Sequence, residues 1–331
     1  MPANAMEKTP KLQPPGAGQG PWLHRYAVLV AAATGLLVFA GGLVTSTGAG
    51  LSVPDWPLSY GMVFPPMVGN VRFEHGHRMV ATTVGLMTIL LAVWLQRREP
   101  RLLLRRLGWL ALAAVVLQGL LGGLTVLLRL PVPVSVAHAC LGQTFFCIVV
   151  AIALLTSQGW RSAPTALPPS GGSLRGVALL CMAAVYVQLV LGALMRHTGA
   201  GLAIPDFPLA FGRLVPPFAT PAVVVHFTHR LVAVAVLGIA AVTAMQALRW
   251  HRLQTQLLGP ALLLVFLVCL QILLGGLTVW SAKSVFPTTL HVLNGALVLA
   301  TSLVLVLRSF RLVAREPARL EAVLPRQAVT T

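Results

Sequence analysis

Eight apolar runs, each long enough to cross a lipid bilayer as a helix, dominate this 331-residue sequence. Only 9% of the residues are charged, whereas soluble proteins carry roughly a quarter. Backbone groups that face lipid must bond within their own segment, and the runs lack the alternation of barrel strands, so we expect helices throughout. The sequence therefore predicts an all-α integral membrane protein, with eight transmembrane helices at about 26–44, 76–96, 107–128, 136–156, 175–195, 227–248, 257–280 and 288–307.

The basic residues predict how this chain is oriented in the membrane. There are 24 Lys and Arg against seven Asp and Glu, and most of the basic residues lie between apolar runs. That placement indicates contact with anionic lipid and disfavours nucleic acid as a partner. With a cytoplasmic N-terminus, 17 of the basic residues face the cytoplasm and seven face outside, so we expect both termini in the cytoplasm.

The chain ends are expected to be tails. Residues 1–24 are polar and rich in Pro and Gly, which predicts a disordered cytoplasmic tail, and residues 311–331 form a second tail. Because residues 1–24 lack the Arg and Ser richness of a mitochondrial address, a bacterial inner membrane is the favoured location.

The sequence contains an internal duplication. Residues 41–61 match residues 192–212 at 12 of 21 positions, and LQGLLGGLTV at 117–126 returns as LQILLGGLTV at 270–279. Each copy holds four spans, an even number, so both copies have the same orientation in the membrane. We therefore predict two four-helix bundles, 25–158 and 175–310, related by a pseudo-twofold axis along the membrane normal and joined by a linker at 159–174.

Four histidines occupy matching positions, near the start of each even-numbered span: His77, His138, His229 and His291. All four imidazoles are expected at a similar depth in the outer half of the bilayer, two in each bundle. A single such histidine is readily explained by packing, but ionisable groups at this depth usually mark a site. Neutral imidazole is a good axial ligand of haem iron, whereas zinc requires three or four converging ligands. The pattern therefore predicts that these histidines ligate haem iron.

The two copies differ beside these histidines. The first copy has Glu74 three residues before His77, and the second has His226 at that place. The carboxylate of Glu74 has two explanations: it moves protons or stabilises positive charge in the pocket, or it merely favours the positive end of a helix. Both remain open on the sequence alone.

Two arginines and two aspartates also repeat near the outer face. Arg78 and Arg230 directly follow two of the histidines, and either pair with haem propionates or reach toward lipid head groups. Asp55 and Asp206 stand in PDWP and PDFP segments, which are typical of tight turns and are alternatively part of a lid over the pocket.

Taken together, these residues resemble the haem A synthase family, the bacterial and mitochondrial membrane enzymes that convert haem O to haem A. The resemblance covers about 26–308 and rests on the two repeats, the Glu-x-x-His-Arg at 74–78 and the histidine of each even span. It implies an oxidoreductase that turns one methyl group of haem O into a formyl group by successive hydroxylations, for delivery to terminal oxidases. It also implies that His229 and His291 hold haem b, that His77 and His138 face the substrate, and that Glu74 is catalytic.

The resemblance leaves several points open. Many bacterial members of the family carry a cysteine pair in the first outer loop, and this sequence has none between 45 and 73. No nucleotide-binding motif is present, so electrons must pass to an unidentified acceptor. Haem O synthase and cytochrome c oxidase assembly factors are the partners that the family implies, and a homo-oligomer is open. The rival functions are a quinol-oxidising dihaem cytochrome b and a haem transporter.

Overall fold

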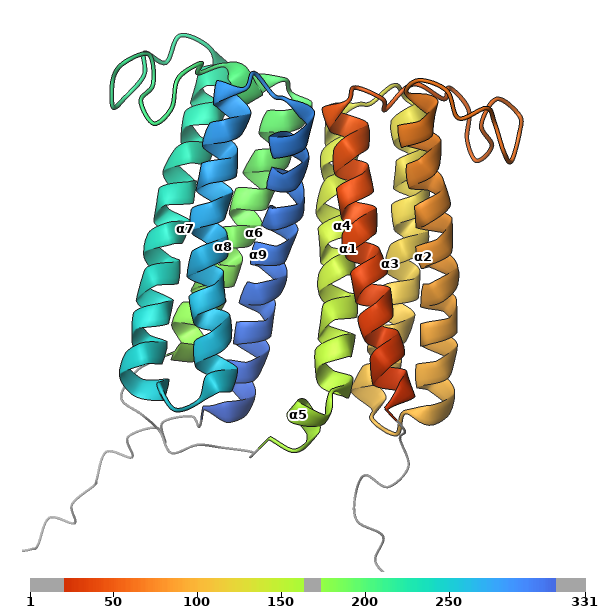
Figure 1. Cartoon of the computed structure of the whole chain (residues 1–331), viewed down its shortest axis with the longest axis vertical. Coiled ribbons are helices and arrows are strands. Elements are labelled where there is room, and N and C mark those ends of the chain that lie inside the picture. Colours follow the sequence, from red (N-terminus) through yellow and green to blue (C-terminus); the bar gives the residue numbers. More distant parts are fainter. Residues whose placement is uncertain (1–20, 164–173, 314–331) are drawn as a thin grey trace, which may run out of the picture.

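The computed structural model describes residues 21–163 and 174–313, in which eight long helices stand side by side as two bundles of four (Figure 1). The first bundle contains α1 (Trp22–Ser46), α2 (Val71–Arg98), α3 (Leu102–Leu127) and α4 (Val132–Thr156). The second contains α6 (Leu174–His197), α7 (Pro221–His251), α8 (Thr255–Trp280) and α9 (Val285–Leu312). Two short helices, α5 (Gln158–Arg161) and the 3₁₀ helix η1 (Ala200–Leu202), complete the described elements.

The eight long helices confirm the eight predicted spans, because each is long and apolar enough to cross a membrane. Several helices begin earlier than the apolar runs suggest. The helix α2 begins at Val71 and α7 at Pro221, so the polar residues before His77 and His229 are helical. Hydropathy marks the part of a helix that lies in hydrocarbon, and these polar turns extend beyond it.

The predicted boundaries fall partly outside the described residues. The tails lie there except for their inner ends, where α1 already begins at Trp22 and α9 continues to Leu312. Of the predicted linker at 159–174, residues 164–173 lie outside the described residues, and its first residues belong to α5.

Within each bundle, every long helix packs on two neighbours. In the first bundle α2 and α4 each pack on α1 and α3, and in the second bundle α7 and α9 each pack on α6 and α8. The helices α2 and α4 are therefore diagonal, as are α7 and α9. These diagonal helices carry the four histidines, so each bundle holds its two histidines on opposite sides of its interior.

The two bundles meet along α1, α4, α6 and α9. Contacts across this seam pair α1 with α9, α4 with α6, and α4 with α9. A twofold relation between the copies requires that an α1–α9 contact be matched by an α6–α4 contact. The α1–α9 and α4–α6 contacts are the pair that a twofold axis requires. The pseudo-twofold axis itself stays a prediction.

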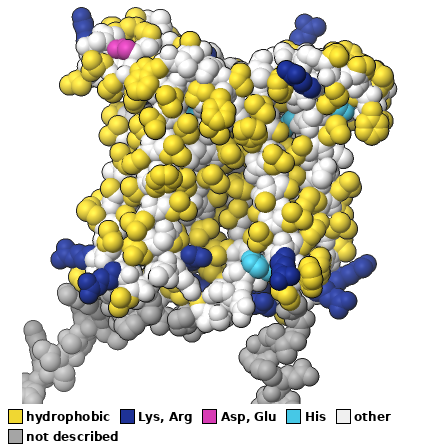
Figure 2. Space-filling model, in the orientation of Figure 1, with side chains coloured by type: hydrophobic (Ala, Val, Ile, Leu, Met, Phe, Trp, Pro, Cys, Tyr) yellow, Lys and Arg dark blue, Asp and Glu magenta, His cyan; other side chains and the backbone are white. Residues whose placement is uncertain are grey.

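The lateral surface is apolar, and charge gathers at the two ends of the bundles (Figure 2). Leucines project from several helices with more than half of their surface exposed, among them Leu86, Leu90, Leu180 and Leu231. In water such a surface drives aggregation, whereas in a bilayer it is solvated by lipid chains. The surface therefore fits a multi-pass membrane protein.

Candidate functional site

The four predicted histidines all lie near the end of the bundles that carries the loops 47–70 and 198–220, here called the loop end. Each imidazole packs against a glycine on the preceding long helix, so closely that a methyl group has no room. The distance from an ideal Cβ on the glycine to Cε1 of the histidine is 3.1 Å for Gly41 and His77, 3.1 Å for Gly122 and His138, 3.0 Å for Gly192 and His229, and 3.3 Å for Gly275 and His291.

One ring nitrogen has the same surroundings in all four of these histidines. In all four, Nδ1 is buried and has no hydrogen-bond partner among the described residues. Buried polar atoms in folded proteins are almost always bonded, so four equivalent exceptions on two diagonal helix pairs have a common explanation. An imidazole that ligates iron through one nitrogen, in a pocket lined by glycine, fits a flat macrocycle between diagonal helices.

A cluster of the kind that binds zinc is not found in the described part of the chain. No group of three or more His, Cys, Asp or Glu is placed to hold a metal ion there. Two histidines per bundle are the ligand set that suits a haem rather than zinc.

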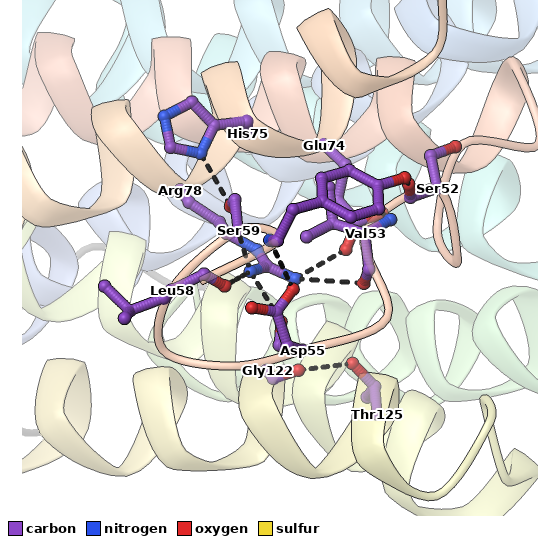
Figure 3. Close-up of polar contacts among 11 residues, drawn as sticks. Ser52, Val53, Asp55, Leu58, Ser59, Glu74, His75, Arg78, Gly122 and Thr125 are labelled. Atoms are coloured by element: carbon purple, nitrogen blue, oxygen red, sulfur yellow. Dashed lines mark hydrogen bonds and ion pairs between the residues drawn. The ribbon is translucent and has the colours of Figure 1, made fainter. Parts of the chain in front are cut away.

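Glu74 belongs to a hydrogen-bonded network between α2 and the first loop (Figure 3). Its side chain is buried, with Oε1 2.7 Å from Nη2 of Arg78, and Oε2 accepts a hydrogen bond of 2.9 Å from the backbone N–H of Val53. Both carboxylate oxygens are therefore used in tying the helix to the loop. Glu74 lies in the first turn of α2, where an acid interacts favourably with the positive end of the helix. In addition it bonds Arg78 and the backbone of the first loop.

Arg78 has a role that the sequence did not indicate. Its guanidinium donates to the carbonyl oxygens of Asp55 at 2.8 Å and Leu58 at 2.7 Å, and lies within hydrogen-bond distance of Ser59 Oγ (Figure 3). The neighbouring His75 bonds the same serine through Nδ1 at 2.8 Å. Arg78 thus anchors the first loop, and the predicted contact with haem propionates stays a prediction.

The second bundle repeats this network with His226 in place of Glu74. Nδ1 of His226 lies 3.2 Å from the backbone nitrogen of Ile204, and Nε2 lies 3.1 Å from Nε of Arg230. A neutral imidazole accepts a hydrogen bond at only one of these two nitrogens. Arg230 also donates to Asp206 O at 2.8 Å and to Leu209 O at 2.9 Å. The two networks hold matching loops by similar bonds, but only the first contains a side-chain carboxylate and the Ser59–His75 bond.

Asp55 and Asp206 shape the loop tips. The Asp55 carboxylate accepts from the backbone N–H of Tyr60 at 2.7 Å and of Gly61 at 2.8 Å. These bonds, with that of Gly61 the larger, hold the pKa of Asp55 below its ordinary value. Asp206 is held in the same way by Gly212 and Phe211, with the same direction of pKa shift. The turn interpretation is therefore supported for both residues.

The loops also send one aromatic ring each into the bundle. An ideal Cβ on Gly123 would lie 2.6 Å from the Trp56 ring, and one on Gly276 would lie 2.9 Å from the Phe207 ring. These glycines directly follow Gly122 and Gly275, which face histidines. Each glycine pair thus makes room for an imidazole at one glycine and for a loop aromatic at the next, a function of the glycines that the sequence did not indicate.

Comparison with known proteins identifies the family of this chain. The family model described as "Cytochrome oxidase assembly protein", COX15-CtaA, matches residues 24–72 and 68–303. A heme A synthase of Caulobacter sp. (strain K31) is 31% identical over 332 residues, covering 85% of this chain and 93% of the relative. A heme A synthase of Beijerinckia indica is 32% identical, covering 84% and 89%, and one of Halalkalibacterium halodurans is 29% identical, covering 80% and 90%. The chain therefore belongs to the COX15-CtaA family, the family of the haem A synthases.

Proposed function

We propose that this haem A synthase divides its work between its bundles: the first bundle oxidises a methyl group of haem O to the formyl group of haem A, and the second retains haem b. The observation that carries this division is the replacement of Glu74 by His226 in two similar networks. Both a carboxylate and an imidazole can take up a proton, but only the carboxylate brings a negative charge that can stabilise positive charge in the pocket. We therefore place the chemistry beside Glu74.

In the first bundle, His77 and His138 would face the substrate from diagonal helices. The binding of a substrate requires that its reacting edge be fixed, and the glycines opposite both rings leave room for the imidazoles that would hold it. Glu74 lies one helical turn before His77, and Arg78 holds its Oε1. Arg78 thereby orients the carboxylate that receives the proton.

In the second bundle, His229 and His291 would hold haem b, which supplies a one-electron redox centre when bound. The chain itself contributes the two imidazoles and the buried surroundings of α7 and α9. Oxidation of a methyl group releases electrons, so an electron acceptor outside the chain is required. By family, haem O synthase and oxidase assembly factors are candidate partners.

We further propose a bacterial inner membrane location with both termini in the cytoplasm. The charge distribution supports this, because basic side chains gather most densely at the end of the bundles opposite the loop end. In that orientation the histidines and Glu74 lie toward the outer face.

The substitution Glu74→His tests the role of the carboxylate. In the second bundle, histidine at this place lies within hydrogen-bond distance of both the loop N–H and the arginine and accepts from one of them, so the variant is expected to keep the first loop in place. It should bind haem b and haem O normally but form less than about 1% of the wild-type haem A, in line with the loss of a negative charge that stabilises positive charge in the pocket. Product is measured by extraction and chromatography after expression with haem O.

The reverse substitution, His226→Glu, is the matched control, because it alters the second network without removing the carboxylate of the first. We expect it to retain haem A formation. Wild-type product from Glu74→His would contradict the assignment of Glu74 as the catalytic group.

A further inference from the structure

Three of the four histidines are held by a glutamine from the preceding long helix. In each case the side-chain amide nitrogen donates to the main-chain carbonyl of the histidine at 2.9 Å, and the pairs are Gln118 with His138, Gln188 with His229, and Gln271 with His291. Each glutamine precedes by four residues the glycine that faces the same imidazole. One helix face therefore offers, in adjacent turns, a bond to the histidine backbone and a space for its ring.

The surrounding residues are adapted to this bond. A carbonyl in a helix ordinarily accepts only from the N–H four residues later. For His138 and His291 that later residue is a glycine, and an ideal Cβ there would lie 2.8 Å from Gln118 Nε2 at Gly142 and 3.2 Å from Gln271 Nε2 at Gly295. The amide nitrogens of Gln118 and Gln188 also lie 3.4 and 3.3 Å from Nε2 of their histidines. The glutamines thus fix the backbone of the histidine and restrict its ring.

The fourth histidine lacks this support. Leu37 stands four residues before Gly41, which faces His77, and the repeat aligns Leu37 with Gln188. Leucine has no donor, and no side chain among the described residues bonds the carbonyl of His77. The second bundle therefore holds both of its histidines by glutamine, and the first bundle holds only His138.

We infer that the glutamines act as clamps on the haem ligands and that Leu37 leaves His77 as the yielding ligand, through which the first bundle exchanges its haem. This inference rests on the proposed function, in which the first bundle binds a substrate and releases a product while the second retains a cofactor. Retention requires two firmly held imidazoles. Release would require both iron–nitrogen bonds to break, each electron pair remaining on its imidazole, and the unclamped His77 would be the ligand that leaves first.

Exchange of the aligned residues tests the clamps. Leu37→Gln should supply the missing clamp and slow the release of haem O and haem A from the first bundle by about fivefold, the equivalent of roughly 1 kcal/mol for one hydrogen bond. Gln188→Leu should speed the release of haem b by a similar factor and leave the other haems unaffected. Release is followed by transfer from the purified full-length protein to excess apomyoglobin, with the haems extracted at intervals and separated by chromatography.

Two controls accompany these variants. Leu37→Met changes the same position without adding a donor, and Gln246→Leu removes a half-buried amide from α7 far along the helix from His229; both should release their haems at the wild-type rates. The inference is overturned if Leu37→Gln and Leu37→Met release haem O and haem A alike, or if Gln188→Leu retains haem b as the wild type does. The two tests lie in different bundles, so misfolding of one variant leaves the other decisive.

Failure of the proposed function has a different signature. If the wild-type protein contains two haem b groups and neither haem O nor haem A, the division into substrate and cofactor halves is wrong. The clamps are then judged by whether Leu37→Gln slows the faster of two haem b release phases, and an unchanged rate overturns them.

Discussion

A glycine opposite each histidine is the residue-scale feature on which the haem sites depend. Overpacking of a tight contact costs about 1–3 kcal/mol and displaces side chains. Gly122 and Gly119 lie one turn apart on α3, but only Gly122 has a neighbour within 4 Å, the ring of His138. The two positions therefore separate the demand for ring space from general effects of adding a methyl group to the helix.

Gly122→Ala is expected to displace the His138 ring and to lower the content of haem O and haem A in the purified protein at least several-fold, with haem b unchanged. Gly119→Ala should bind all haems as the wild type does. Pigment extraction from the two variants measures this difference, and equal haem content would mean that the glycine is not needed for the ring.

Whether a residue of the candidate site could be recognised in the sequence depended on its residue type. The four histidines, Glu74 and the two arginines stand out because polar groups are rare in apolar runs. The glutamines did not, since a single half-buried amide in a membrane helix is explained equally well by packing. Only the alignment of Leu37 with Gln188, read together with the bonds that the glutamines make, separates the two halves.

At the scale of elements, the helices were predictable and the loops were not. Length and hydropathy fix a spanning helix, but the ends of α2 and α7 lie in polar turns that hydropathy does not detect. The loops are positioned by long-range bonds, such as those from Arg78 to the carbonyls of Asp55 and Leu58. Nothing in the local sequence indicates which carbonyls an arginine 20 residues away will reach.

The first loop depends on the ionised form of Asp55. Its pKa is lowered by the N–H groups of Gly61 and Tyr60, so these bonds stabilise the loop above the ordinary pKa of an aspartate and weaken as the pH falls through the lowered value. At neutral pH the loop tip is therefore fully supported. Acidification below about pH 4, the ordinary range for Asp, begins to remove that support.

Asp55→Ala should remove both bonds at every pH. We expect the amides of Tyr60 and Gly61 to exchange with deuterium faster, whereas the matching amides of the second loop, bonded to Asp206, stay protected. Asp206→Ala should give the opposite pattern. Equal protection of the first loop in the wild type and in Asp55→Ala would contradict the role given to this carboxylate.

At the scale of the whole molecule, the chain is a duplicated four-helix unit whose copies differ at residues beside the four histidines, such as Glu74 and His226. Contacts between α1 and α9 and between α4 and α6 join the halves. Arg196 at the end of α6 crosses this seam and bonds Thr45 and Ser46, the residues that align with Arg196 and His197 in the repeat. The two copies thus carry different residues at these aligned positions, and the difference allows hydrogen bonds that join the two bundles.

The most direct test of the division between the halves is the haem content of variants that each lack one ligand. The protein is expressed with a supply of haem O, purified, and its haems are extracted and identified by chromatography and mass. The wild type should contain haem b together with haem O, haem A or the hydroxylated precursor. His77→Ala should lose all but haem b, and His229→Ala should lose haem b. Two unmodified haem b groups in the wild type, as in an electron-transfer cytochrome, or loss of the same haem in both variants, would contradict the account.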